Sequence, residues 1–322
     1  MSEDLVWHYT DAAGFKGIIE RNEIWASHAR HMNDPEERLF LSRPFESKVI
    51  EELIGLRRED EIESWRETFR DRDIGRSGAV ESWPGYFIAC GTKSSDELIM
   101  WRDYGKNQAA YAIGFDRSID FRQKFAEVSN SEERKGSFSW REVKYWNKRD
   151  DLPTDIKEYI EAVFKNMAIL PDGIDESRPG WEFDALVLFY DKISSVYKHS
   201  AYEVERELRL TVAESDPTGW DFRSSPKGLV PFVRLESAGE GAGDLVAHAE
   251  VNPQLPVRQV MLSPGATRDD MLAASALLRA SGYSARLGSC NSKDGDMGGD
   301  GSFRRMHPNA EVLISRSDAR MR

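Results

Sequence analysis

The chain has 322 residues, of which 40% are apolar and 31% charged, and its formal net charge is −12. This balance is typical of a globular protein and excludes wholesale disorder and a membrane-embedded chain. The acidic charge argues against a protein that coats nucleic acid, because such a protein needs a basic surface. It leaves open an enzyme that meets nucleic acid through a local basic patch.

From the sequence we expect no membrane-spanning helix, signal peptide or disulfide. The longest unbroken apolar run, Ala185–Tyr190, is far shorter than the ~18 residues that a membrane-spanning helix needs. The acidic amino terminus differs from a signal peptide, which is basic and then apolar. Cys90 and Cys290 lie far apart, so we expect neither a disulfide framework nor a Cys-based zinc site. The sequence predicts a cytoplasmic protein with no membrane partner.

The first forty residues begin with a strand pattern and a capped helix. Val6–Tyr9 is typical of a strand, and Asp11 can cap a helix that carries three apolar residues on one face: Phe15, Ile18 and Ile19. A His- and Arg-rich segment, Ser27–Glu37, follows and contains the turn signal Asn33-Asp34-Pro35.

Helical and extended patterns alternate in the middle of the chain. From Phe45 to Phe69 the apolar residues keep a helical period, with a break near Gly55, within a highly charged sequence. Asp96–Tyr104 has the length of one or two helical turns, and Ile74–Pro84 has the composition of a loop. Three short runs are typical of strands: Tyr86–Cys90, Ala109–Asp116 and Val143–Trp146.

Two apolar stripes at helical spacing come next. Ile156–Met167 and Leu186–Tyr197 both repeat apolar residues every three or four positions, which favours core helices over a cofactor-binding stripe. Glu205–Ala213 then changes to a period of two, with an apolar face and a densely charged face. This change predicts a strand.

The last third of the chain contains a strand at Leu229–Leu235 and a strand–helix–strand unit. The unit comprises Val257–Leu262, Thr267–Ser281 and Ser284–Leu287, with Thr267 as the N-cap, Asp270 three residues later and Gly282 as the terminator. Two low-complexity patches, Ser237–Gly243 and Asp294–Gly301, are expected to be mobile loops.

No linker of convincing length divides the chain. We therefore expect one α+β domain over residues 1–322, with helical insertions near 45–75 and 154–199.

Two candidate functional segments contain aromatic residues. His8-Tyr9-Thr10 ends the first strand, and Trp101-Arg102-Asp103-Tyr104-Gly105 follows the polar strand exit Cys90–Ser95. Each segment alone has an ordinary structural explanation. A histidine at a strand end commonly binds a backbone carbonyl, and aromatic residues are most often core residues.

A third candidate is the charged run Glu205-Arg206-Glu207-Leu208-Arg209. In a strand, alternation places both carboxylates and the Arg209 guanidinium on one face, with the carboxylates about 7 Å apart. Such close like charges repel unless a cation lies among them, and Arg209 is one candidate. The alternative is an exposed sheet face with surface ion pairs.

Other chemistry has weak support or none. His28, His31 and the nearby acidic residues Asp34, Glu36 and Glu37 are metal-ligand types, but they lack a metal-binding spacing, and we expect no metal. The acidic loop near Asp294 lacks the glutamate of a calcium loop, because Arg305 stands at the twelfth position. Dinucleotide-binding glycine, Walker and nucleophile-elbow motifs are absent.

The candidate segments together resemble a known superfamily. A His-Tyr-Thr strand, a central aromatic element and a late Glu-x-Glu strand, in this order, are similar to ADP-ribosyltransferases of the His-Tyr-Glu kind. The closer resemblance is to a bacterial family that is described as a domain of unknown function. The resemblance extends from about residue 5 to about residue 290. The segments that carry it are His8-Tyr9-Thr10, Gly17-Ile18-Ile19, Met32-Asn33-Asp34-Pro35-Glu36-Glu37, Cys90-Gly91-Thr92, Met100-Trp101-Arg102-Asp103-Tyr104-Gly105, Gly114-Phe115-Asp116 and Glu205-Arg206-Glu207-Leu208-Arg209. Three positions depart from the family pattern: Gly91 replaces a phenylalanine, Thr92 a serine and Met32 a leucine.

This resemblance implies a mixed, mostly antiparallel split sheet with surrounding helices, and NAD as the co-substrate. Breaking the nicotinamide–ribose bond of NAD creates an oxocarbenium-like cation, which a nearby carboxylate stabilises. The resemblance assigns that role to Glu207, and it implies that Glu205 orients or deprotonates the acceptor. Tyr104 would stack on the nicotinamide cation, with Tyr9 as the alternative, and His8 would bind the adenosine-side ribose.

Several NAD contacts stay open at this point. Thr10 and Thr92 offer hydroxyls for the ribose or the carboxamide, and Trp101 belongs to the same aromatic segment as Tyr104. Either Arg30 or Arg102 would meet the pyrophosphate.

The implied function is that of a glycosyltransferase: an NAD-dependent ADP-ribosyltransferase that modifies RNA, DNA or protein. Similar families suggest a toxin-like or anti-phage defence effector that an antitoxin-like partner inhibits. The net charge disfavours duplex DNA, whereas the Arg-rich stretches Phe303–His307 and Arg316–Arg322 leave room for single-stranded RNA. Two alternatives are an NAD glycohydrolase and a non-catalytic module that binds a nucleotide or a protein.

Overall fold

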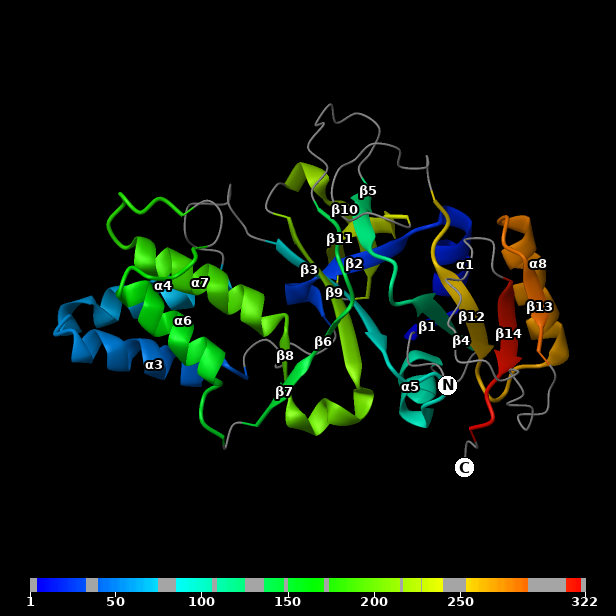
Figure 1. The fold of residues 1–322 in the computed structure, drawn as a ribbon, viewed down its shortest axis with the longest axis horizontal. Coiled ribbons are helices and arrows are strands. Elements are labelled where there is room, and N and C mark those ends of the chain that lie inside the picture. Colours follow the sequence, from blue (N-terminus) through cyan, green and yellow to red (C-terminus); the bar gives the residue numbers. More distant parts are fainter. Residues whose placement is uncertain are drawn as a thin grey trace.

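The computed structural model describes residues 5–32, 40–74, 85–105, 109–124, 136–147, 150–170, 174–214, 217–226, 228–239, 253–288 and 311–319. Within these ranges the chain forms one sheet of twelve strands, a second sheet of two strands, and helices that surround them (Figure 1). The expected α+β class with a mixed, largely antiparallel sheet is confirmed. Whether the chain is one domain stays a prediction.

The main path across the large sheet joins strands from both ends of the sequence. In spatial order it contains β10 (Asp221–Ser225), β11 (Gly228–Ser237), β2 (Ile24–His28), β3 (Gly85–Thr92), β1 (Leu5–Asp11), β4 (Ala110–Asp116), β12 (Val257–Leu262), β14 (Val312–Arg316) and β13 (Ala285–Leu287). Three strands lie off this path: β5 (Phe121–Lys124) pairs with β11, β9 (Glu207–Glu214) pairs with β3, and β6 (Arg141–Glu142) pairs with β9. The β12–β14 and β13–β14 pairs are parallel, and the other pairs of this sheet are antiparallel.

The sheet splits at its centre, beside β3. On one edge β3 pairs with β9 over its whole length, but on the other edge it pairs with two different strands. There β2 pairs with Phe87 and Ile88, whereas β1 pairs with Thr92. The intervening residues, Ala89–Gly91, therefore lie where β1 and β2 diverge.

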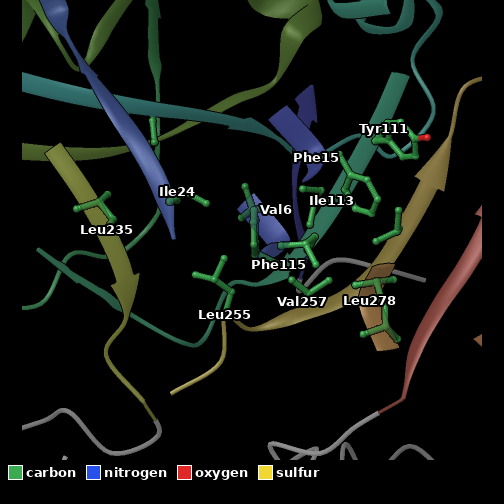
Figure 2. Packing of buried hydrophobic residues seen from close by; sticks show 14 of the residues in the cluster. Val6, Phe15, Ile24, Tyr111, Ile113, Phe115, Leu235, Leu255, Val257 and Leu278 are labelled. Carbon is green, nitrogen blue, oxygen red and sulfur yellow. The ribbon is translucent and has the colours of Figure 1, made fainter. Parts of the chain in front are cut away.

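Different helices pack against the two faces of the central strands. In β4, Tyr111, Ile113 and Phe115 point to the main core, as their alternation predicts, where α1 (Ala12–Arg21) and α8 (Arg268–Ala280) pack (Figure 2). The intervening residues Ala110 and Ala112 contact the opposite cluster, beneath α5 (Leu98–Gly105). Because both faces of the sheet are covered, β4 is buried along almost its whole length.

A separate helical layer lies at one end of the molecule, on the left in Figure 1. It contains α3 (Ser42–Gly55), α4 (Ile62–Ile74), α6 (Thr154–Phe164) and α7 (Trp181–Ser194), and these helices share their own buried cluster. Both expected helical insertions belong to this layer. The small parallel sheet of β7 (Lys144–Trp146) and β8 (Tyr197–His199) connects it to β9.

Local signals correctly predicted the termini of two helices. The Asp11 side chain accepts a hydrogen bond from the Gly14 amide (2.8 Å) and caps α1. At α8, Thr267 and Asp270 form a reciprocal capping box, and the left-handed backbone of Gly282 (φ 86°) follows its end. The break predicted near Gly55 is also present, since α3 ends there.

Other boundaries differ from the prediction. The apolar stripe Leu186–Tyr197 is not one helix, because α7 ends at Ser194 and Tyr197 begins β8. Likewise α6 ends at Phe164, and Met167 is exposed. Several strands were not predicted from the sequence, namely β2, β5, β6, β8, β10 and β14.

Several predictions fall on residues outside the described ranges. They concern the turn at Asn33-Asp34-Pro35, most of the loop Ile74–Pro84, Cys290, the patch Asp294–Gly301 and the stretch Phe303–His307. Among the helices of the described ranges, none combines the length and apolarity that crossing a bilayer requires.

Candidate functional site

A cavity of about 550 Å³ opens at the split of the sheet, and its volume is typical of small-molecule sites. Its walls come from β1, β2, β3, α5, β8, β9 and β10, and from the 3₁₀ turns Ala29–His31 and Ser200–Glu205. Six residues that the sequence singled out line it together: His8, Tyr9, Thr10, Tyr104, Glu205 and Glu207. Segments about 100 residues apart in the chain therefore meet at one place.

The Glu207 carboxylate lies at one end of the cavity between two cations. Arg209 donates to both of its oxygens, from Nε at 2.8 Å and from Nη2 at 3.1 Å. Lys198 Nζ donates to Oε2 at 2.9 Å. All three side chains are at least nine-tenths buried, so the charges compensate one another where water cannot. Arg209 was one candidate for the compensating cation and does pair with Glu207, but Lys198 was not predicted.

These contacts keep Glu207 ionised. Burial alone would raise the pKa of its carboxyl group, but the charge and hydrogen bonds of Arg209, with the charge of Lys198, outweigh burial and lower this pKa to about 2. At neutral pH the cavity therefore contains a permanent carboxylate.

Glu205 lines the cavity from a turn and not from the predicted strand. The strand β9 begins at Glu207, so the expectation that alternation along a strand aligns the two carboxylates is wrong. Glu205 ends the preceding 3₁₀ turn, and Arg206 between them has a left-handed backbone (φ 44°). Lys198 instead joins the carboxylates, since its Nζ lies 2.8 Å from Glu205 Oε2.

The His8 side chain joins β1 to β3 beside the split of the sheet. Its Nδ1 lies 2.7 Å from the Cys90 carbonyl oxygen, which can only accept, so Nδ1 carries a hydrogen. Burial lowers the pKa of His8, which keeps the ring neutral at pH 7. In that neutral tautomer Nε2 is a hydrogen-bond acceptor.

An aromatic wall borders the cavity on the α5 side. Tyr9 lies between Trp101 (ring centroids 4.6 Å apart) and Tyr104 (6.4 Å). The Tyr9 hydroxyl donates to the Ser94 carbonyl and accepts from the Glu97 amide, so it holds the loop before α5. Trp101 is buried behind Tyr9, whereas Tyr104 is 38% exposed. Tyr9 and Tyr104 both line the cavity, and Tyr104 is the most exposed of the three rings.

The two predicted threonines differ in position. Thr10 lines the cavity. Thr92 is buried, and its hydroxyl donates to the Glu205 carbonyl (2.6 Å) and accepts from the Ser94 amide (3.1 Å). Thr92 therefore anchors the Glu205 turn rather than facing the cavity.

Gly91 has no room for a side chain. A Cβ built there would lie 2.3 Å from Val6 Cγ1 and 3.3 Å from Trp140 Cζ3. Neighbouring side chains thus fill the space that a larger residue would need.

The arginine that lines the cavity was not predicted. Arg30 lies outside the lining and 4.0 Å from Asp191, and Arg102 is exposed beside Asp103. Arg223 of β10 lines the cavity instead, at the end away from Glu207, and donates to Ser27 Oγ (3.2 Å). Because Ser27 is opposite Ile88 and Glu207 opposite Thr92 on β3, the backbone positions of Ser27 and Glu207 lie about 13 Å apart along that strand.

The cavity has no evident metal site. Among the described residues, no group of three or more His, Cys, Asp or Glu side chains is arranged to hold a metal ion. Its polar groups instead provide carboxylates at one end and a guanidinium at the other, which suits an extended organic ligand.

One family model matches this sequence. It is described as "Protein of unknown function (DUF2971)", and it matches residues 100–210. This span includes Tyr104, Lys198, Glu205, Glu207 and Arg209, but not His8 or Arg223. No curated protein and no solved structure matches the chain.

Proposed function

We propose that this protein is an NAD-dependent ADP-ribosyltransferase, which transfers ADP-ribose from NAD to a macromolecule. The observation that carries the proposal is that His8, Tyr104 and Glu207, from three remote segments, line one cavity at the split of the sheet. Their order along the chain matches the His-Tyr-Glu pattern of the superfamily that the sequence resembles.

The charge state of Glu207 suits this chemistry. When the bond between nicotinamide and ribose breaks, its electron pair leaves with nicotinamide and positive charge develops on the ribose. A fixed, ionised carboxylate stabilises that charge without reorganising. A pKa of about 2 for Glu207 favours this electrostatic role over that of a proton donor.

The other cavity residues fit the remaining parts of NAD. The Tyr104 ring can stack on the cationic nicotinamide, and His8 Nε2 can accept a hydrogen bond from a ribose hydroxyl. At the opposite end Arg223 can pair with the pyrophosphate, a role for which the sequence had suggested Arg30 or Arg102. NAD has this polarity, with a cationic ring at one end of the molecule and phosphates farther along.

The acceptor that we propose is RNA, DNA or protein. The net charge of −12 favours protein or single-stranded RNA over duplex DNA. A toxin-like or anti-phage role with an inhibitory partner, in the cytoplasm, is the corresponding biological proposal.

Labelled NAD tests the function directly. Purified protein is incubated with NAD labelled in the adenylate phosphate and a cell lysate, and the products are divided and treated with protease, ribonuclease or deoxyribonuclease. We expect label in one macromolecular class, and its loss in Glu207→Gln. Glu158→Gln, at an exposed position of α6, is the control for loss of a glutamate charge.

The other outcomes separate the alternatives. Free ADP-ribose without labelled macromolecule would indicate an NAD glycohydrolase. Absence of any nicotinamide release would indicate a non-catalytic binding module. Transfer that persists in Glu207→Gln would refute the role of Glu207.

A further inference from the structure

The carboxylates of Glu205 and Glu207 differ in the number of cations that pair with them. Glu207 is held by Arg209 through two hydrogen bonds and by Lys198 through a third. For Glu205, by contrast, Lys198 is the cation within ion-pair distance among the residues that the structure describes. Removing Lys198 would therefore leave Glu207 paired but Glu205 unpaired.

The position of Lys198 is defined by burial, by the Tyr202 ring and by its place in β8. Its side chain is 8% exposed, and its Nζ lies 4.9 Å from the Tyr202 ring centroid. Its backbone belongs to β8, where it is opposite Tyr145 of β7, and the Tyr145 hydroxyl accepts from the Glu207 amide (2.8 Å). The same small sheet therefore sets the position of the ammonium group and of the first residue of β9.

The backbone alone does not align Glu205 with Glu207. Glu205 is 26% exposed, and the left-handed Arg206 separates its 3₁₀ turn from the strand. A partly exposed glutamate at the end of a turn has several rotamers of similar energy, unless a charged partner selects one.

We propose that Lys198 is a positioning residue for acceptor attack: its ammonium group holds the Glu205 carboxylate beside Glu207, where the acceptor enters. This inference rests on the proposed transferase function. In the transfer step the carbon–nitrogen bond to nicotinamide breaks, and the acceptor's lone pair forms the new bond at the same ribose carbon. The proton that the acceptor loses passes to Glu205 and from there to water.

The consequence is a specific effect on the fate of ADP-ribose. Cleavage of NAD depends on Glu207, which retains Arg209, whereas transfer also depends on an oriented Glu205. Loss of Lys198 should therefore lower transfer more than cleavage, and water should capture a larger share of the ADP-ribose. Displacement of a positioned group by about 1 Å costs on the order of a hundredfold, so we expect the ratio of transfer to hydrolysis to fall about tenfold or more.

The experiment measures labelled macromolecule and free ADP-ribose from the same reaction. Lys198→Met removes the charge at nearly constant length, Lys198→Arg retains a charge, and Lys192→Met, exposed on α7, is the matched control. We expect the ratio to fall in Lys198→Met, to recover at least partly in Lys198→Arg and to stay unchanged in Lys192→Met. In a Glu205→Gln background, Lys198→Met should cause no further change in the ratio of transfer to hydrolysis.

Each contrary result has a distinct meaning. If the wild-type protein neither labels a macromolecule nor releases ADP-ribose, the proposed function itself fails, and this inference with it. If wild-type transfer occurs and folded Lys198→Met keeps the wild-type ratio, only the role of Lys198 is refuted. If Lys198→Met does not fold, the double variant Lys198→Met/Glu205→Gln, which removes both charges, is compared with Glu205→Gln, and unequal ratios refute the role.

Discussion

The buried ion-pair cluster makes a quantitative prediction about stability and pH. Glu207 ionises more readily in the folded protein than in the unfolded chain, because Arg209 and Lys198 surround it. A carboxyl group with a depressed pKa stabilises the fold above its unfolded pKa, and this stabilisation is lost as the pH falls towards the folded value. The substitution Glu207→Gln should remove that pH dependence.

The magnitude follows from the two pKa values. A folded pKa of about 2 against the ordinary 4.5 corresponds to about 3 kcal/mol of unfolding free energy at neutral pH. Linkage places about 1 kcal/mol of the loss between pH 5.5 and pH 3.5. Because Glu207 is only 6% exposed, solvent screens its ion pairs only weakly.

Urea unfolding, followed by tryptophan fluorescence over this pH range, measures the effect. We expect the unfolding free energy of the wild-type protein to fall by about 1 kcal/mol more than that of Glu207→Gln. Glu158→Gln is the control for loss of an exposed glutamate. A constant difference between wild type and Glu207→Gln across the range would refute the cluster as described.

Two further predictions concern Arg223, at the other end of the cavity, and Gly91 of β3. Arg223→Met should weaken ADP-ribose binding about tenfold to a hundredfold in calorimetry, since a charge-assisted hydrogen bond is lost, and Arg178→Met, at an exposed site, should not. An unchanged dissociation constant for Arg223→Met would place the phosphates elsewhere. Gly91→Ala should lower the unfolding free energy by about 1–3 kcal/mol, because its Cβ would collide with Val6, whereas a Cβ at Gly17 meets nothing within 4 Å. Equal stability of Gly91→Ala and Gly17→Ala would show that the core adapts without cost.

Local chemistry made part of the fold predictable. The caps at Asp11 and Thr267 act within one helical turn, so their residue types alone define where α1 and α8 begin. The alternation in β4 was likewise visible, since its larger side chains all face one core.

Errors arose where tertiary packing extended a local pattern. Val196 and Tyr197 continue the apolar period of α7, because they pack against the same buried cluster as the helix does. The chain nevertheless leaves the helix after Ser194 to pair with β7. A hydrophobic period reports burial in a common core, and it cannot reveal this change of backbone.

The candidate site was predictable only in part, for the same reason. Resemblance selected His8, Tyr104 and Glu207, which line one cavity. Lys198 follows a predicted helix, where a lysine is an ordinary terminal charge. Arg223 lies in a short polar strand whose pairing with β11 depends on contacts remote in sequence. Neither position carries a local signal.

The direct succession of α7 and β8 couples the helical layer to the cavity. Arg209 Nη1 donates to the Ser195 carbonyl (2.9 Å), one residue after α7 ends, and Lys198 follows three residues later. Both cations around Glu207 are thus attached to the end of one helix. A shift of α7 would therefore move both cations around Glu207 together.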